Sequence, residues 1–262
     1  MCSAVFLYCR STAHGLCHNC MMRTIKYDIK AVKQNTSECM QTAATQTLSY
    51  FDKTVQVADV IREVPVYIDE KGHKIGTSPG HLASYFAKKG YNTTAYIFDT
   101  ELFDRSWGGM TSASVITNLR DRQKAIPDNS WLAKYHHILV EGWELYAKAG
   151  GHFVFSGISG TMLHNLLDHG PYLISLNSTY LNGKPKQRYD TALDKFVDDA
   201  ISGRSLTHGT TCAGYKDNKF LIVDPDPPEG TDQHRWIEQD HLIASIMAAQ
   251  TESDNLLISI TK

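Results

Sequence analysis

The sequence has little net charge and no long run of basic residues. Its 26 lysine and arginine side chains are balanced by 28 aspartate and glutamate side chains, which gives a formal net charge of −2. Proteins that bind nucleic acid through its phosphates usually carry clustered positive charge. We therefore expect no nucleic-acid partner.

Long apolar runs are also missing. No stretch approaches the roughly 20 apolar residues that a membrane-spanning helix needs. The apolar run Ala4-Val-Phe-Leu-Tyr8 is too short for the core of a signal peptide. We expect a protein without a membrane span that acts in the cytoplasm, or that is secreted into a host cell without a classical signal peptide.

Internal repeats and low-complexity linkers are absent as well. The hydrophobic fraction of 42% and the charged fraction of 21% are ordinary for a folded protein. A chain of 262 residues is long enough to bury a sizeable core. We predict one domain of two lobes over residues 25–262, preceded by a Cys/His-rich N-terminal arm over residues 1–24.

The cysteines are unevenly distributed, and a chain of this length does not need a disulfide framework. Two of the six, Cys17 and Cys20, lie near His14 and His18 and could supply part of a zinc site. The second ligand pair that would complete such a site is missing. We therefore interpret this segment as a loosely held arm, and we predict no metal and no cofactor. The cysteines are Cys2, Cys9, Cys17, Cys20, Cys39 and Cys212.

Cys39 lies at the predicted start of a helix. A polar, turn-prone run that ends in Ser37, a candidate N-cap, precedes it, and Ala43, Ala44 and Leu48 follow at helical spacing. The positive end of a helix lowers the pKa of a thiol, and the thiolate is the nucleophilic form. A cysteine at a helix start is more commonly a small buried hydrophobe, so this interpretation requires a base. Gln34, five positions upstream, could donate a hydrogen bond to an oxyanion.

A candidate base lies far downstream, in a predicted β-hairpin. One strand begins at His208, and the second ends at Asp224, which Pro225 follows. Antiparallel pairing would place these two side chains next to each other, so that Asp224 could hold the imidazole of His208 in one tautomer. His152 is a rival base, because Gly151 and Gly157 around it imitate the same motif. No strand ending in Asp-Pro follows His152, and we rank it below His208.

Together these motifs resemble a known family. A Gln-x4-Cys motif at the start of a helix, then His-x5-Gly-Tyr, then a strand ending in Asp-Pro is similar to the papain-like cysteine peptidases of clan CA. The similarity is greatest to the bacterial branch of bacteriocin-processing (double-glycine leader) peptidases and secreted papain-like effector proteases. Residues 77–91 and 162–176 resemble the segments that lie between the motifs in that family.

The resemblance implies a fold and a set of site residues. It implies an α+β, papain-like fold, in which an N-terminal helical lobe carries the nucleophile helix and packs on an antiparallel β-sheet lobe that carries the His/Asp hairpin. It assigns the nucleophile to Cys39, the general base to His208, the orienting carboxylate to Asp224 and the oxyanion donor to Gln34. Two departures are Met40, where relatives usually carry Gly or Trp, and a Gln-to-Cys spacing one residue shorter than in many relatives.

The implied activity is hydrolysis of a peptide or amide bond through a Cys-His-Asp triad and a thioester, with a peptide or protein as substrate. Two alternatives remain open. The same triad could serve an acyltransferase, a transglutaminase-like enzyme or a deamidase, because an amine can replace water as acceptor. The chain could also be a catalytically silent peptide-binding module.

The remaining segments carry further expectations for the fold. We predict helices over residues 79–89, 131–149, 193–201 and 236–247, and strands over residues 25–32, 93–98, 171–176 and, at a sheet edge, 256–260. The aromatic side chains of Phe103, Trp107, Trp143 and Tyr146 are expected in the core. The pair Asp198 and Asp199 is interpreted as a solvated face rather than as paired catalytic carboxylates.

Overall fold

The computed structural model of the protein describes residues 23–35, 37–64, 66–68, 74–127, 131–190, 192–193, 195–249 and 255–262. The N-terminal Cys/His cluster lies outside these residues. No helix in the described part of the chain is both long and apolar enough to cross a membrane.

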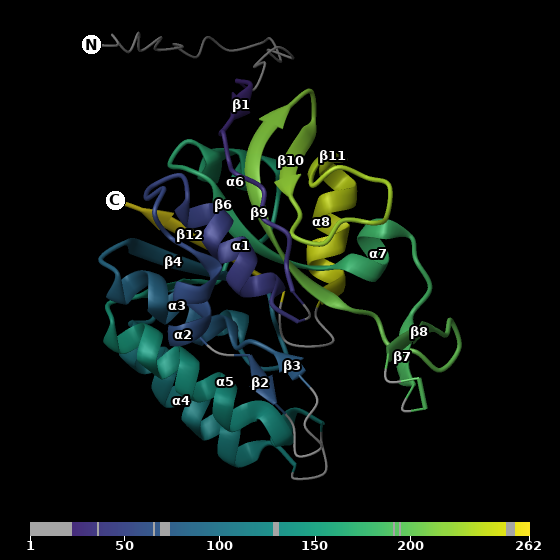
Figure 1. Ribbon diagram of the computed structural model, residues 1–262. Coiled ribbons are helices and arrows are strands. Elements are labelled where there is room, and N and C mark those ends of the chain that lie inside the picture. The colour runs from purple at the N-terminus through teal and green to yellow at the C-terminus, as the bar shows by residue number, and fades with distance from the viewer. Residues whose placement is uncertain are drawn as a thin grey trace, which may run out of the picture.

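An eight-stranded sheet forms the centre of the molecule (Figure 1). Its strand order is β11-β10-β9-β6-β12-β4-β5, with β1 also paired to β9. Neighbouring strands are antiparallel except for β4 and β5, which are parallel. The strands are β1 (Ile25–Lys26), β4 (Asn92–Ile97), β5 (His152–Val154), β6 (Tyr172–Asn177), β9 (Thr207–Lys216), β10 (Lys219–Val223), β11 (His234–Glu238) and β12 (Leu256–Thr261).

Two small two-stranded sheets complete the β-structure. One pairs β2 (Tyr67–Ile68) with β3 (Lys74–Gly76), and the other pairs β7 (Gln187–Asp190) with β8 (Lys195–Asp198). The β7–β8 hairpin projects from the main body of the molecule (Figure 1).

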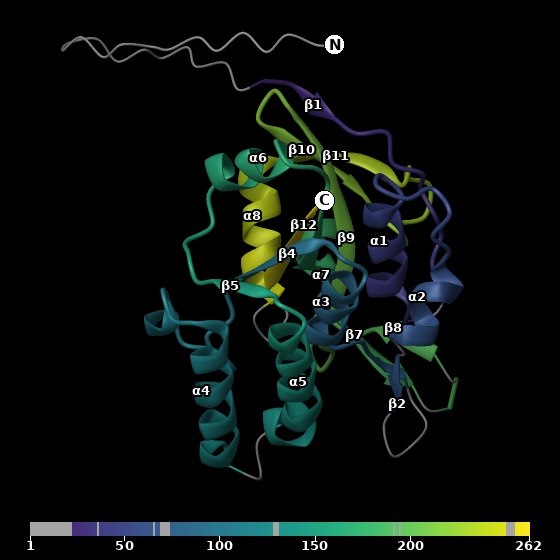
Figure 2. The same ribbon diagram turned by 90° about the vertical axis from the view of Figure 1, so that its left-hand side faces the viewer.

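Helices cover both faces of the main sheet, as Figures 1 and 2 show. Successive residues of the central strands point to opposite faces, so Ile258 joins one core and Leu257 the other. Helices α1 to α5 enclose the first core, and α6 and α8 enclose the second. The helices are α1 (Cys39–Leu48), α2 (Val57–Glu63), α3 (Pro79–Lys88), α4 (Ser112–Ala125), α5 (Trp131–Lys148), α6 (Gly160–Leu167), α7 (Ser178–Asn182) and α8 (Gln239–Met247), with a 3₁₀ turn η1 (Arg105–Trp107).

Helix α1 is buried along nearly its whole length and packs against β9. Some of its polar side chains are hydrogen-bonded, since Thr47 Oγ1 and Thr211 Oγ1 lie 3.0 Å apart and Thr211 Oγ1 also donates to the carbonyl oxygen of Ala43 at 2.9 Å. Thr42 Oγ1 is buried without a hydrogen-bond partner among the described residues. At the start of the helix, Gly209 of β9 lies directly against Met40. A β-carbon at position 209 would lie 2.5 Å from Met40 Sδ. The absence of a side chain at Gly209 therefore permits the close approach of α1 to β9.

The predicted α+β class is confirmed, with α1, the helix that begins at Cys39, packed on the sheet that carries the β9–β10 hairpin. The predicted helices over 79–89 and 131–149 are present as α3 and α5. Phe103, Trp143 and Tyr146 are buried in the first core, with Trp107 partly buried against it.

Three expectations for the fold are wrong. Residues 195–198 form strand β8 rather than a helix, because Phe196 pairs across the hairpin with Tyr189, their rings 5.4 Å apart. The helix expected from residue 236 begins only at Gln239, since β11 occupies the preceding residues. Strand β12 is central rather than at an edge, because it pairs with both β4 and β6.

Candidate active site

The β9–β10 hairpin places one histidine beside one carboxylate. A two-residue connection, Asp217 and Asn218, closes the hairpin with positive φ angles of 48° and 62°, which asparagine and aspartate tolerate better than most residues. His208 lies at the start of β9, and Asp224 follows the end of β10. The structure brings the two together, with His208 Nε2 2.7 Å from Asp224 Oδ1.

Cys39 enters this site as the first residue of α1. The turn before it is tight, because Ser37 has a φ of +63°. The expected Ser37 cap is wrong, since Glu38 occupies the N-cap position and its side chain makes no capping hydrogen bond. The Cys39 side chain is partly buried and forms a hydrogen bond with His208. Because Nε2 of His208 is hydrogen-bonded to Asp224, Nδ1 is the ring nitrogen of His208 that is available to Cys39.

The electrostatics of the cysteine favour its thiolate. Burial alone would raise the pKa of the Cys39 thiol, but the hydrogen bond and positive charge of His208, with hydrogen bonds from the backbone of Gly209 and Met40, lower the pKa below its ordinary value. The same partners act on the histidine. Burial would lower the pKa of His208, yet its hydrogen bonds with Asp224 and Cys39 raise it well above the ordinary value. The pair therefore favours a thiolate beside an imidazolium.

Asp224 is fully buried and has a hydrogen-bond donor on each oxygen. Oδ1 also accepts from the backbone N–H of Asp226 at 2.9 Å, and Oδ2 accepts from Arg235 Nη1 at 3.0 Å. Burial would raise the pKa of this carboxyl, but His208, the Asp226 N–H and the charge of Arg235 lower it. Asp224 is thus held as a carboxylate in a dry environment.

Arg235 is a site residue that sequence reasoning missed, because the sequence analysis predicts a helix from residue 236 and no strand before it. The residue types of β11 do not alternate between apolar and polar, so the sequence carries no clear signal for it; in the structure, intermediate burial at Arg235 and Ile237 alternates with exposure at His234 and Trp236. That period of two is typical of a strand. A strand next to β10 necessarily lies close to Asp224.

Gln34 lies beside the site but has another partner. Its backbone N–H donates to the carbonyl oxygen of Pro225 at 3.0 Å, and its side-chain Nε2 donates to Asp226 Oδ2 at 3.1 Å. The amide therefore lies against the turn that follows Asp224. Its role as an oxyanion donor stays a prediction.

The other candidate residues are not brought to this site. His152 lies on β5, and β6, β12 and β4 separate that strand from β9. Cys212 is buried within β9, where burial raises the pKa of its thiol to about 12. Asp199 forms an ion pair with Arg188 at 3.1 Å. Among the described residues, no cluster of three or more His, Cys, Asp or Glu side chains is placed to hold a metal ion.

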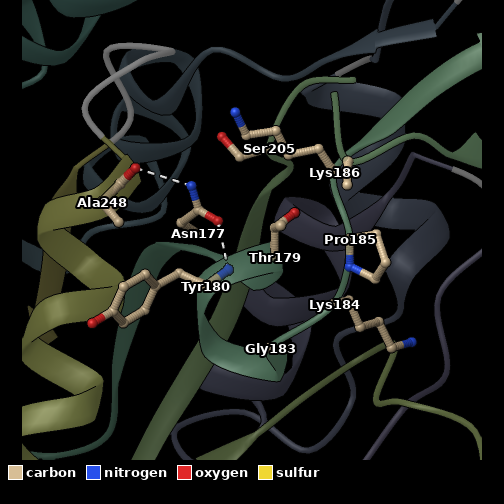
Figure 3. Close-up of a pocket in the computed structure, with 10 residues that line it drawn as sticks. Asn177, Thr179, Tyr180, Gly183, Lys184, Pro185, Lys186, Ser205 and Ala248 are labelled. Atoms are coloured by element: carbon tan, nitrogen blue, oxygen red, sulfur yellow. Dashed lines mark hydrogen bonds between the residues drawn. The ribbon is translucent and has the colours of Figure 1, made fainter. Parts of the chain in front are cut away.

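A hollow of about 560 Å³ lies near the base of the β7–β8 hairpin. Figure 3 shows that Asn177 closes one side of it, with its amide donating to the carbonyl oxygen of Ala248 and its oxygen accepting from the N–H of Tyr180. Lys184 and Lys186 line the other side. Cys39 and His208 are not among its lining residues, so this hollow is separate from the candidate site.

Comparisons with known proteins add a likeness of fold. No protein-family model matches the chain, and no curated protein matches it. One similar solved structure is described as a C39-like peptidase from Bacillus anthracis, with 12% identity and a TM-score of 0.45 over 92% of this chain and 98% of the other. Another is the peptidase domain of Streptococcus ComA, a bi-functional ABC transporter involved in a quorum-sensing pathway, with 14% identity and a TM-score of 0.40 over 89% of this chain and 98% of the other. Both are described as peptidases, the class that the sequence motifs resemble. At these values the likeness carries no weight for the activity, which has to be argued from the site itself.

Proposed function

We propose that the protein is a cysteine peptidase in which Cys39 is the nucleophile, His208 is the general acid and base, and Asp224 is the orienting carboxylate. The observation that supports this most directly is the continuous hydrogen-bonded line from Cys39 through His208 to the buried Asp224. A nucleophile bonded to a base that a third group orients is the arrangement that covalent acyl transfer requires.

The proposed reaction begins with Cys39 as thiolate and His208 as imidazolium. The sulfur attacks the carbonyl carbon of a peptide bond, a C–S bond forms, and the carbonyl oxygen takes the negative charge. The C–N bond then breaks as His208 Nδ1 gives its proton to the leaving amine, which leaves a thioester on Cys39. His208 next takes a proton from water, whose oxygen attacks the thioester carbon. The C–S bond then breaks with Cys39 leaving as thiolate, the carboxylic acid is released, and His208 remains as imidazolium.

The oxyanion requires hydrogen-bond donors close to the sulfur. We assign this role to the backbone N–H of Cys39 and to the side-chain amide of Gln34. The Gln34 amide has two N–H groups, and Asp226 accepts a hydrogen bond from this nitrogen. The second N–H is the one proposed to donate to the developing charge.

The test compares the parent protein with the variant Cys39→Ala, using fluorescein-labelled casein as the probe and mass spectrometry of the products. We expect the parent to cleave casein and the variant to lose cleavage while its thermal unfolding stays close to that of the parent. Retention of full cleavage by the folded variant would overturn the assignment. Deamidated or amine-linked products in place of new peptide ends would redirect it to deamidation or acyl transfer.

A second measurement decides the matter when casein is not a substrate. Iodoacetamide reacts with thiolates, so it should alkylate Cys39 at neutral pH much faster than Cys212, whose pKa is raised to about 12. Equal and slow labelling of both would instead favour a peptide-binding module without catalysis.

A further inference from the structure

The carboxylate behind the histidine has a second, cationic neighbour. Asp224 uses Oδ1 for His208 and the Asp226 N–H, and it uses Oδ2 for Arg235. The orienting group is therefore held from both sides. His208 by itself would leave Oδ2 without a partner on a side chain that has no exposed surface.

The guanidinium of Arg235 is itself fixed at two points. Its Nη1 donates to Asp224, and its Nη2 donates to Asn182 Oδ1 at 2.8 Å. Arg235 lies on β11 opposite Ile222 of β10, the strand that ends just before Asp224. Its side chain is only 16% exposed. A planar group bonded at both ends, with little room to move, fixes the direction of its N–H bonds.

We propose that Arg235 is a positioning residue of the active site, which keeps Asp224 turned toward His208 and places a permanent positive charge behind the carboxylate. This inference rests on the proposed function, because it concerns how the same triad is held. Asn182, at the end of α7, is the residue that holds Arg235 in turn.

The position of the charge has a consequence that can be measured. His208 and Arg235 face Asp224 from β9 and β11, and Asp226 lies in the turn beside it. Cys39 faces His208 from α1, with Glu38 next to it in sequence. A fixed positive charge disfavours proton binding at every one of these groups. Removing it should therefore move the pH at which Cys39 becomes reactive to higher values, whereas loss of a merely structural contact would lower the rate without moving that pH.

The experiment measures the rate of Cys39 alkylation by iodoacetamide against pH, resolved by peptide mass spectrometry, in the full chain. Three variants are compared with the parent, and thermal unfolding confirms that each is folded. Arg235→Met removes the charge and the donors, Arg235→Gln removes the charge but keeps an amide donor, and Arg235→Lys keeps the charge. We expect the two neutral variants to move the midpoint upward by about half a pH unit or more, which is roughly a threefold slower reaction below the midpoint. Arg235→Lys should keep the midpoint of the parent.

Each other outcome has a defined meaning. A folded neutral variant with the midpoint of the parent overturns the inference and leaves the proposed function intact. Failure of both neutral variants to fold, with Arg235→Lys folded, also overturns it, because the charge then serves the fold rather than the site. If Cys39 of the parent reacts no faster than Cys212 at neutral pH, the proposed function itself fails, whatever the variants do.

Discussion

His208 and His136 are both almost completely buried, with exposed fractions of 8% and 2%. His208 lies where α1, β9 and β10 meet, and it bonds to a carboxylate and a thiol. His136 lies on α5, and neither of its ring nitrogens has a hydrogen-bond partner among the described residues. Burial, with the nearby charges of Arg122 and His137, lowers the pKa of His136 to about 4, whereas the partners of His208 raise its pKa despite burial.

The difference between the two histidines comes from their partners rather than from their depth. Burial penalises the charged imidazole at both positions, and only a carboxylate with a second acidic group reverses the sign. A buried histidine alone is therefore weak support for a catalytic site. A buried histidine whose two nitrogens are both occupied by ionisable groups supports one much better.

The largest expected effect follows from removing the carboxylate beside His208, which would leave this buried histidine, like His136, without a negatively charged partner. Asp224→Asn removes the charge beside the imidazole, so the pKa of His208 should fall, and cleavage should drop roughly a thousandfold or more. The change also leaves the partly buried Arg235 without its carboxylate, which should cost about 3 kcal/mol in free energy of unfolding. NMR titration of the His208 ring and chemical denaturation measure the two effects.

A matched control for that experiment is Asp226→Asn. The side chain of Asp226 accepts a hydrogen bond from Gln34 rather than from His208, so the titration of His208 should stay close to that of the parent. An unchanged His208 titration in the Asp224→Asn variant would show that the carboxylate is not the cause of the difference in pKa between His208 and His136.

The next effect in size comes from moving the thiol away from His208. In Gly209→Ala, the new methyl group would lie 2.5 Å from the sulfur of Met40 and 3.0 Å from its α-carbon. Helix α1 must shift, which should cost about 2 kcal/mol in stability and slow Cys39 alkylation at pH 6 by about tenfold. The double variant Met40→Ala with Gly209→Ala should recover part of the lost stability and part of the lost alkylation rate. In that variant the clash with the sulfur is gone, and only the crowding against the backbone of residue 40 remains.

Gly157→Ala is the control for that change. Its added β-carbon would lie 3.9 Å from the nearest atom, Arg105 Nη2, so stability and alkylation should match those of the parent. A Gly209→Ala variant that also matched the parent would mean that the close approach of α1 and β9 does not determine the reactivity of Cys39.

A smaller effect concerns His136 and pH. Its folded pKa of about 4 lies below the ordinary value of 6.5, so its neutral form contributes stability that is complete above pH 6.5 and is lost as the pH falls toward 4. In His136→Leu this part of the acid destabilisation should disappear, a difference of about 2 kcal/mol between pH 7.5 and pH 4.5. Chemical denaturation at several pH values measures it. An exposed histidine that is not among the groups acting on His136 serves as the control, since His169→Gln should keep the pH dependence of the parent. Identical curves for His136→Leu and the parent would contradict the prediction.

The smallest effect is expected at the second buried cysteine. Cys212→Ala should leave cleavage and Cys39 alkylation unchanged, because burial holds the Cys212 thiol neutral at physiological pH. The lost sulfur should cost about 1 kcal/mol in stability. A fall in the rate of Cys39 alkylation would mean that the two thiols are coupled.

The sequence predicts the parts of the fold whose patterns are local. The period of apolar residues predicts α3 and α5, and turn residues between two β-rich runs predict the β9–β10 hairpin with His208 and Asp224 near each other. The sequence does not predict α1 as a helix buried on all sides, because Gln41, Thr42 and Gln46 are polar yet completely buried. The two glutamine side chains bond to distant segments: Gln41 Nε2 donates to the carbonyl oxygen of Val64 at 2.9 Å, and Gln46 Nε2 donates to that of Val32 at 3.2 Å.

Arg235 and Gly209 escape prediction for the same reason. The contact of Arg235 with Asp224 requires that β11 pair with β10, and β11 has too few residues to give a strong period-two signal. The function of Gly209 is visible only once Met40 lies against it. The sequence shows which residue stands at each position, but the role of each residue depends on contacts with segments distant in the sequence.

The central place of β12 has a consequence for how the chain reaches its final form. β4 and β6 are not paired with each other, and β12 joins them. Of the strands described, β12 is the last to leave a ribosome, so the two halves of the sheet cannot be joined until Leu256–Thr261 has emerged. A protease that cut the chain just before Leu256 would therefore detach the strand that, in the described sheet, bridges the β4–β5 half and the half that carries His208.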